Sequence, residues 1–394
     1  MKLNLKKYSV VSLFCLLICV STVQAQVATI PFENDNLMFI KVKVNDHSEL
    51  LNFVFDTGAS TIVLDEAVAQ KLGVTSDYQQ STEGAAGSET YNIALSQKLH
   101  IQDITLANAH MVLVDLSRLS KRGNQKIDGI VGANIMQQFV TRLNFDDNAI
   151  ELYKSINDIA NVNEYKALPA LLDFANIPQI QLEFTLENDQ KFSGNFLFDS
   201  GANMTFLLNT PFVNKQKIES IIGKTIENKA ESLTTSSTFK IGKVTNVKLA
   251  KFEFGEMPID LSKSESGVMA SDEYAGILGV KIINRFNTIL DYKNKKIYFK
   301  PNNTYTNEFE FPLSGISIEK EAKKIQISNV IKDTEAFAKG IRKGDELVSI
   351  DGKKMSNIKA YRELLKQKNK KIELVLKDKN GSAKTVIITL KRLI

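Results

Sequence analysis

The sequence contains no tryptophan, three histidines and two cysteines among its 394 residues. Both cysteines, Cys15 and Cys19, lie in an expected leader at 1–25, so the rest of the chain has no thiol for a disulfide or a metal site. The histidines are scattered without the spacing of a metal site, which argues against a zinc hydrolase. A Gly-x-Ser-x-Gly elbow is also missing. We therefore expect no metal and no cofactor, and the common nucleophilic routes to hydrolysis are disfavoured.

Residues 1–25 have the pattern of a secretory signal. Three lysines among the first seven residues precede an apolar run at 10–20, which is too short to span a bilayer comfortably. Val-Gln-Ala at 23–25 fits the small-x-small rule for cleavage. An uncleaved anchor is the alternative, whereas a lipoprotein is disfavoured because the residue before Cys19 is not small. We expect export to a bacterial periplasm, the cell surface or the medium, with no stable membrane insertion after cleavage.

The chain contains one motif twice. Residues 52–61 read NFVFDTGAST, and residues 195–204 read NFLFDSGANM. In each copy an apolar strand ends in an aspartate, Asp56 or Asp199, and a hydroxyl residue and a glycine follow at once. A single copy could be an aspartate that caps a turn. Because a carboxylate is costly to bury beside an apolar strand, two copies favour a functional pair.

The repetition extends beyond the motif. The segments Gly-Ile-Val-Gly at 129–132 and Gly-Ile-Leu-Gly at 276–279 lie 147 residues apart. Predicted strands at 141–145 and 288–292 are separated by the same offset, as are the turns and strands that follow them. Residues from about 26 to 305 are therefore a tandem duplication.

These residues resemble the aspartic proteases. In that family Asp-Thr/Ser-Gly is followed, some seventy residues later, by two apolar residues and a glycine, as here in both repeats. Ala59 and Ala202 after the glycines are similar to the viral, retropepsin-like branch, because the pepsin branch usually has Ser or Thr there. The resemblance implies a mainly β protein with two retropepsin-like acid-protease lobes in tandem, at 26–158 and 159–305.

The resemblance also implies an aspartic-type endopeptidase with Asp56 and Asp199 as the catalytic pair. In such a pair the two carboxyl groups lie about 3 Å apart and cannot both ionise, so they share a proton. One then takes a proton from water while the other donates to the substrate carbonyl. Thr57, Gly58, Ser200 and Gly201 would support the active loops, and substrate contacts would fall to Ser60, Asn203, Gly84, Ala85, Ala86 and Gly87.

The last four of these residues belong to a small-residue segment at 82–88. Its simplest interpretation is a hairpin turn. In the family, a hairpin at this place is the flap that closes over substrate, and glycine suits a loop whose backbone approaches a peptide closely. The corresponding segment at 232–238 has no glycine. We therefore expect one dominant flap.

From about residue 312 the repeat pattern stops. Residues 338–352, AKGIRKGDELVSIDG, are similar to the PDZ domains of bacterial exported proteases. The resemblance implies an α+β PDZ-like domain at 312–394, with helices expected at 333–339 and 357–368. Its peptide groove would lie at Gly315, Ile316, Ser317 and Ile318, although this run departs from the usual Gly-apolar-Gly-apolar pattern.

Charge is unevenly distributed along the chain. Residues 312–394 hold 20 Lys and Arg against 10 Asp and Glu, so the net charge of +5 leaves −5 for the rest. The simplest interpretation is a solvated surface, and the functional one is attraction of acidic peptides, chain termini or anionic membranes. Nucleic acid is an improbable partner, because the chain has no aromatic-basic motif.

The expected partners are a peptide or protein substrate and a C-terminal peptide at the PDZ-like domain. Because one chain supplies both aspartates, we expect a monomer. The alternative function is a non-catalytic peptide-binding protein that retains the protease cleft. Two intact aspartates argue against it.

Overall fold

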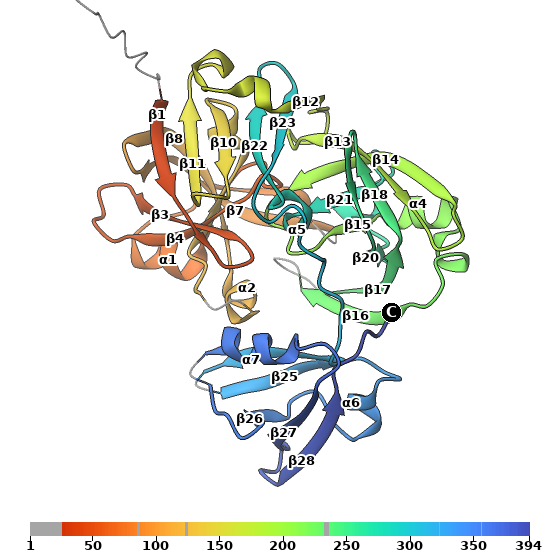
Figure 1. Cartoon of the computed structure of the whole chain (residues 1–394). Coiled ribbons are helices and arrows are strands. Elements are labelled where there is room, and N and C mark those ends of the chain that lie inside the picture. The colour runs from red at the N-terminus through yellow and green to blue at the C-terminus, as the bar shows by residue number, and fades with distance from the viewer. Residues whose placement is uncertain (1–25, 85–86, 123–124, 232–235, 323, 356) are drawn as a thin grey trace, which may run out of the picture.

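The computed structural model describes residues 26–394, with gaps at 85–86, 123–124, 232–235, 323 and 356 (Figure 1). The predicted signal at 1–25 lies outside the described residues, as do Ala85 and Ala86 of the predicted flap. The strands of the described chain form four β-sheets. None of the described helices is both long enough and apolar enough to cross a membrane.

The first repeat forms an eight-stranded sheet. The strand that leads into Asp56 pairs in parallel with the strand of the Gly-Ile-Val-Gly segment, with Val54 opposite Ile130. In spatial order the strands are β2 (Glu33–Asn34), β3 (Met38–Val44), β4 (Leu51–Phe55), β9 (Gly129–Val131), β5 (Ile62–Asp65), β8 (Ile104–Val114), β7 (Gly87–Ile101) and β6 (Tyr78–Gly84).

The second repeat forms a nine-stranded sheet with the same arrangement at its centre. The strand that carries Asp199 also pairs in parallel with its glycine-flanked partner, with Leu197 opposite Ile277. In spatial order the strands are β16 (Ile226–Glu231), β17 (Ser236–Val244), β20 (Met257–Ser262), β15 (Phe206–Leu208), β21 (Gly276–Gly279), β14 (Lys191–Asp199), β13 (Gln179–Thr185), β18 (Asn246–Leu249) and β19 (Phe252–Phe254).

A third sheet of six strands is shared by the two repeats. Its central strands pair antiparallel, and Arg142 faces Ile289 directly. These two residues are 147 positions apart, which is the offset of the duplication, so the local two-fold axis passes between them. In order the strands are β1 (Gln26–Pro31), β11 (Ala149–Tyr153), β10 (Val140–Asn144), β22 (Phe286–Asp291), β23 (Lys296–Pro301) and β12 (Lys166–Pro169).

Short helices join the strands of the repeats. Asp65 is the N-cap of the first of them, α1 (Glu66–Lys71), and its Oδ1 accepts the Val68 N–H at 3.2 Å. Gly73 ends this segment in the left-handed region, with φ +66°. The other helices of the repeats are α2 (Ser117–Arg122), α3 (Ala133–Met136), α4 (Thr210–Lys215) and α5 (Val280–Ile283).

The C-terminal domain has its own sheet and its own apolar core, lined largely by isoleucine and leucine. Two helices are shorter than predicted. The first begins after Thr334, because Asp333 has a left-handed backbone with φ +59°, and the second ends at Leu365 with Lys366 as its C-cap. The sheet order is β24 (Ile316–Glu321), β25 (Lys324–Val330), β26 (Glu346–Ile350), β27 (Lys371–Lys377) and β28 (Ala383–Thr389), and the helices are α6 (Glu335–Ala338) and α7 (Ile358–Leu365).

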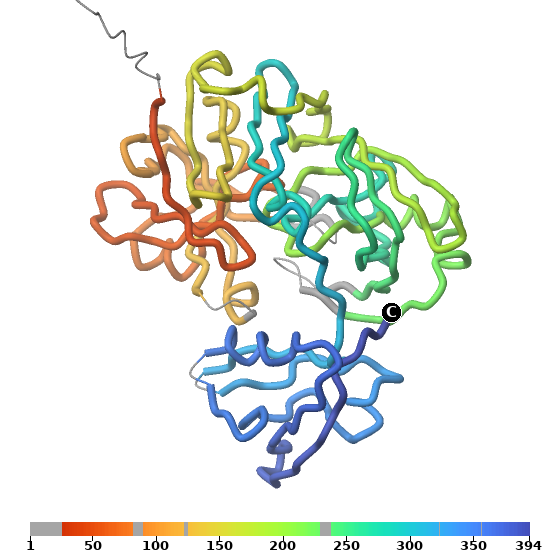
Figure 2. Tube along the Cα trace, viewed as in Figure 1, coloured from red at the N-terminus to blue at the C-terminus, as the bar shows by residue number. Residues whose placement is uncertain are grey.

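The C-terminal domain packs against the β16–β17 hairpin of the second repeat. Figure 2 shows the C-terminal segment returning from the domain toward that repeat. Leu393 joins a small buried cluster that includes Ile226 and Phe239 of the hairpin. Nearby, the Asn329 side-chain amide donates to that of Asn228 at 2.9 Å. The domain is therefore held to one hairpin by both apolar and polar contacts.

The C-terminal domain also contacts the first repeat. Lys359 of α7 forms an ion pair with Asp35 at 3.3 Å. Helix α2 of the first repeat lies against β24, the edge strand of the C-terminal sheet. The domain thus touches both repeats.

Candidate active site

Asp56 and Asp199 meet between the two repeats. Each follows a buried strand, β4 or β14, and their carboxyl groups lie within hydrogen-bonding distance of each other. The Gly58 N–H donates to Oδ1 of Asp56 at 2.7 Å, and the Gly201 N–H donates to Oδ1 of Asp199 at 2.8 Å. The duplicated motif therefore builds two matched loops around one pair of carboxyl groups.

Two buried hydroxyl groups link these loops. The Thr57 N–H donates to Oγ of Ser200 at 3.0 Å, and the Ser200 N–H donates to Oγ1 of Thr57 at 2.9 Å. Each hydroxyl then donates across the interface to a strand carbonyl, from Thr57 to Phe198 at 2.6 Å and from Ser200 to Phe55 at 3.1 Å. Since both side chains are fully buried, these four bonds fix the separation of the loops.

The glycines of the motif make the close approach of the loops feasible. A Cβ atom at Gly58 would lie 2.4 Å from Cγ of Asp199, and one at Gly201 would lie 2.2 Å from Oδ2 of Asp56. Each loop therefore rests on the carboxyl group of the opposite repeat. No side chain fits at either position without displacing that carboxyl group.

A second pair of glycines lies behind the loops. A Cβ atom at Gly132 would lie 2.2 Å from the carbonyl oxygen of Asp56, and one at Gly279 would lie 2.3 Å from that of Met204. These contacts support the loops from the side opposite to the carboxyl groups. The next residue in each repeat also donates its N–H to a loop carbonyl, from Ala133 to Ala59 at 2.9 Å and from Val280 to Ala202 at 2.8 Å.

The environment of the pair keeps protons bound. Burial raises the pKa of Asp56, although N–H donors from Gly58, Gly201 and Ala59 oppose this effect. Burial and the adjacent charge of Asp56 together hold the pKa of Asp199 well above its usual range. Because two adjacent carboxyl groups in a buried site cannot both ionise, the pair as a whole retains one proton.

Two of the predicted substrate-contact residues lie on the loops that carry the pair. Ser60 and Asn203 are exposed on the two loops. In the predicted flap, β6 and β7 form a hairpin that closes with Gly84 opposite Gly87. The second repeat has a hairpin of its own, β16–β17, whose last pair is Glu231 with Ser236. Both repeats therefore supply a hairpin.

The residues of the predicted PDZ groove lie at the start of β24. Gly315 has φ +72°, and Ile316 and Ile318 are buried in the core of the domain. Ser317 between them is only partly buried. The Arg362 guanidinium of α7 donates to the Ile318 carbonyl at 3.2 Å, so the helix is already tied to the free edge of this strand.

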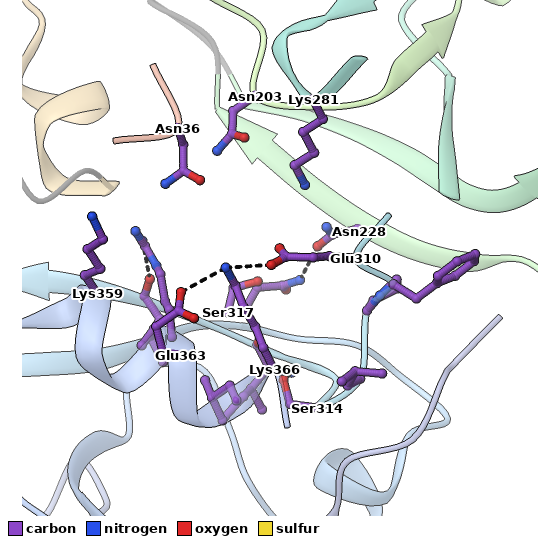
Figure 3. Close-up of a pocket in the computed structure, with 18 of the residues that line it drawn as sticks. Asn36, Asn203, Asn228, Lys281, Glu310, Ser314, Ser317, Lys359, Glu363 and Lys366 are labelled. Carbon is purple, nitrogen blue, oxygen red and sulfur yellow. Dashed lines mark hydrogen bonds and ion pairs between the residues drawn. The ribbon is translucent and has the colours of Figure 1, made fainter. Parts of the chain in front are cut away.

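A cavity of about 670 Å³ lies between the repeats and the C-terminal domain (Figure 3). Asn203 and Lys281 enter it from the second repeat, and Lys359 and Lys366 face them from α7 (Figure 3). Sequence reasoning gave no indication of this cavity, because its walls come from segments far apart in the chain. Elsewhere in the described part of the chain, no group of three or more His, Cys, Asp or Glu is placed to hold a metal ion.

Comparison with known families agrees with the fold. Residues 40–135 match the family model of aspartyl proteases. Residues 310–377 match that of PDZ domains. The chain thus combines an aspartyl protease-like domain with a PDZ domain, as predicted.

A solved structure similar to this chain is the crystal structure of an aspartic proteinase from Irpex lacteus. It shares 12% sequence identity with this chain at a TM-score of 0.46, covering 71% of this chain and 98% of its own. Comparison with curated protein sequences gives no match.

Proposed function

We propose that the protein is an aspartic-type endopeptidase that hydrolyses peptide bonds with a water molecule activated between Asp56 and Asp199. The observation that carries this proposal is the pairing of the two carboxyl groups, held together by four buried hydrogen bonds from Thr57 and Ser200. Burying two carboxyl groups in one interface is unfavourable, so a purely structural role for the two turns does not account for them.

The reaction uses a pair that holds one proton, and it is written here with Asp56 as the ionised member and Asp199 as the protonated one. Asp56, as the carboxylate, takes a proton from water, and the water oxygen attacks the carbonyl carbon of the scissile bond. Asp199 donates its proton to the carbonyl oxygen, which leaves a tetrahedral diol. Asp56 then returns its proton to the amine nitrogen as the C–N bond breaks, while Asp199 recovers a proton from the diol. Atoms and charges balance without a cofactor.

Other residues have supporting roles in this proposal. Ser60, Asn203 and the hairpin segment 84–87 hold the peptide backbone, while Gly58 and Gly201 let the loops meet. The PDZ domain binds a peptide or a partner near Gly315 and Ile318. We further propose that the chain acts as a monomer after export and cleavage of residues 1–25.

The test is proteolysis by the chain from residue 26 to 394. The protein is incubated with a diverse peptide mixture, and new ends are mapped by mass spectrometry across pH 4 to 8 in parallel with a variant that lacks both aspartates, Asp56→Asn with Asp199→Asn. Cuts made only by the unsubstituted protein support the proposal. Binding of a statine-type peptide without any cleavage would instead indicate a peptide-binding protein.

A further inference from the structure

The cavity between the repeats and the PDZ domain begins at the active loop. Asn203, four residues after Asp199, lies on its upper wall, and Ser314 and Ser317 lie on the opposite wall (Figure 3). The loop that carries Asp199 therefore contributes one wall residue to a space of about 670 Å³. The lining is mainly polar, with amide, hydroxyl and charged side chains.

Lys281 is held in this wall by the active loop itself. Its N–H donates to the Met204 carbonyl at 3.1 Å, and the preceding Val280 N–H donates to the Ala202 carbonyl at 2.8 Å. These bonds lie on either side of Asn203. The side chains of Lys281 and Asn203 consequently enter the cavity at fixed positions next to each other (Figure 3).

Lys281 differs from the other lysines of the cavity. Lys359 pairs with Asp35 at 3.3 Å, and Lys366 pairs with Glu310 at 2.9 Å. Among the described residues, no carboxylate lies within ion-pair distance of the Lys281 ammonium. Burial lowers the pKa of Lys281, and the charges of Glu310 and Asp260 only partly oppose this effect. A crowded cation without a partner is unfavourable until an anion enters.

We propose that the cavity is a binding site for a carboxylate of the peptide that occupies the cleft, with Lys281 as its cationic partner and the Asn203 amide beside it. This inference rests on the proposed function, because it takes the occupant of the cleft to be a peptide. The carboxylate belongs either to the C-terminus of that peptide or to an acidic side chain. The predicted groove residues Ile316, Ser317 and Ile318 line the same cavity. What is new here is the cation, because Lys281 comes from the second repeat and not from the PDZ domain.

The proposal is tested with four fluorescent peptides of one sequence. Each peptide ends in a free acid or an amide and carries Glu or Gln at one internal position. The set of four is repeated with that position moved along the sequence. Binding is measured by anisotropy to full-length chain with Asp56→Asn, so that no cleavage intervenes. We expect neutralising the recognised carboxylate to weaken binding about tenfold, as for one charged hydrogen bond.

Three lysine variants in the same background complete the test. Lys281→Met should bind all four peptides alike, and Lys281→Arg should restore the discrimination. Lys293→Met is the matched control, because Lys293 is exposed in the turn between β22 and β23 and its loss removes the same charge. This control should keep the full discrimination.

The outcomes separate the inference from the proposed function. Discrimination between acid and amide identifies the C-terminus, and discrimination between Glu and Gln identifies a side chain. Equal binding of all four peptides to a chain with Lys281 intact overturns the inference, as does discrimination that survives Lys281→Met. Turnover is measured separately with the unsubstituted aspartates. If the protein distinguishes the peptides in binding but cleaves none of them, the proposed peptidase activity is wrong and the carboxylate site is supported.

Discussion

Gly201 of the second repeat lies directly on the carboxyl group of Asp56 of the first, with space for no more than a hydrogen atom between them. A Cβ atom there would be 2.2 Å from Oδ2 of Asp56. Gly58 has the same relationship to Asp199. The two carboxyl groups can thus approach each other only because neither Gly58 nor Gly201 has a side chain.

Gly201→Ala should therefore disrupt the pair. The added methyl group must push Asp56 or its loop away, and we expect at least a 100-fold loss of turnover, as for loss of positioned general acid–base groups. Overpacking should also cost about 1–3 kcal/mol of stability. Turnover is measured on a mapped peptide, and stability by urea unfolding. Gly255→Ala is the control, because no atom lies within 4 Å of its Cβ position. Equal activity of the two variants would contradict the geometry.

Asp199→Asn should abolish turnover and change how stability depends on pH. Burial and the charge of Asp56 hold the pKa of Asp199 well above its usual range. The folded protein thus binds this proton more tightly than the unfolded chain does, so its stability falls as pH rises from about 4 through the raised pKa. In the variant, the free energy of unfolding should decrease less as pH rises. Urea unfolding at several pH values checks it, and parallel curves for both proteins would refute the raised pKa.

The activity profile should extend to mildly acidic or near-neutral pH. The working proton is lost only as pH rises through the raised pKa, and Ala59 and Ala202 provide no hydroxyl to lower it. Replacing both alanines by serine adds donors that favour the ionised form. The upper limb of the pH profile should then move to lower pH. Replacement by cysteine is the control of similar size with a weaker donor. An optimum as acidic as that of gastric enzymes would count against this account.

Leu393→Ala should loosen the β16–β17 hairpin. Leu393 is buried against Ile226 and Phe239, and truncating a buried leucine costs about 2–5 kcal/mol where neighbours cannot collapse. We expect faster hydrogen exchange in β16 and β17, with β6 and β7 unchanged as an internal reference. Ile387→Ala serves as the control, since Ile387 is 50% exposed on β28. Unaltered exchange in the hairpin would show that the domain does not hold it.

Local sequence signals placed the elements that carry Asp56 and Asp199. The apolar strand predicted to end at Asp56 is β4 (Leu51–Phe55), because the apolar run and the following turn residues are both strong signals. The loop that carries Asp199 could be predicted from the loop that carries Asp56, because the motif is duplicated. By contrast, the helix expected at 333–339 begins only after Thr334, because Asp333 adopts a left-handed conformation that its residue type merely tolerates.

The features that sequence reasoning missed depend on long-range packing. Lys281 occupies the position in the second repeat that Asn134 occupies in the first, and nothing local distinguishes it from a surface lysine. Its environment exists only once α7 and the start of β24 are placed opposite it. The docking of Leu393 on the hairpin is equally non-local. No periodicity or motif in the sequence predicts such contacts.

The direct opposition of Arg142 and Ile289 also bears on the ancestry of the chain. In a dimer of identical single repeats, the residue on the two-fold axis would face its own copy. An arginine there would meet an arginine, and like charges directly opposite each other destabilise a strand pair. A fused gene can change one copy alone. Joining the repeats thus released this position from self-complementarity and allowed the two halves to diverge where they touch.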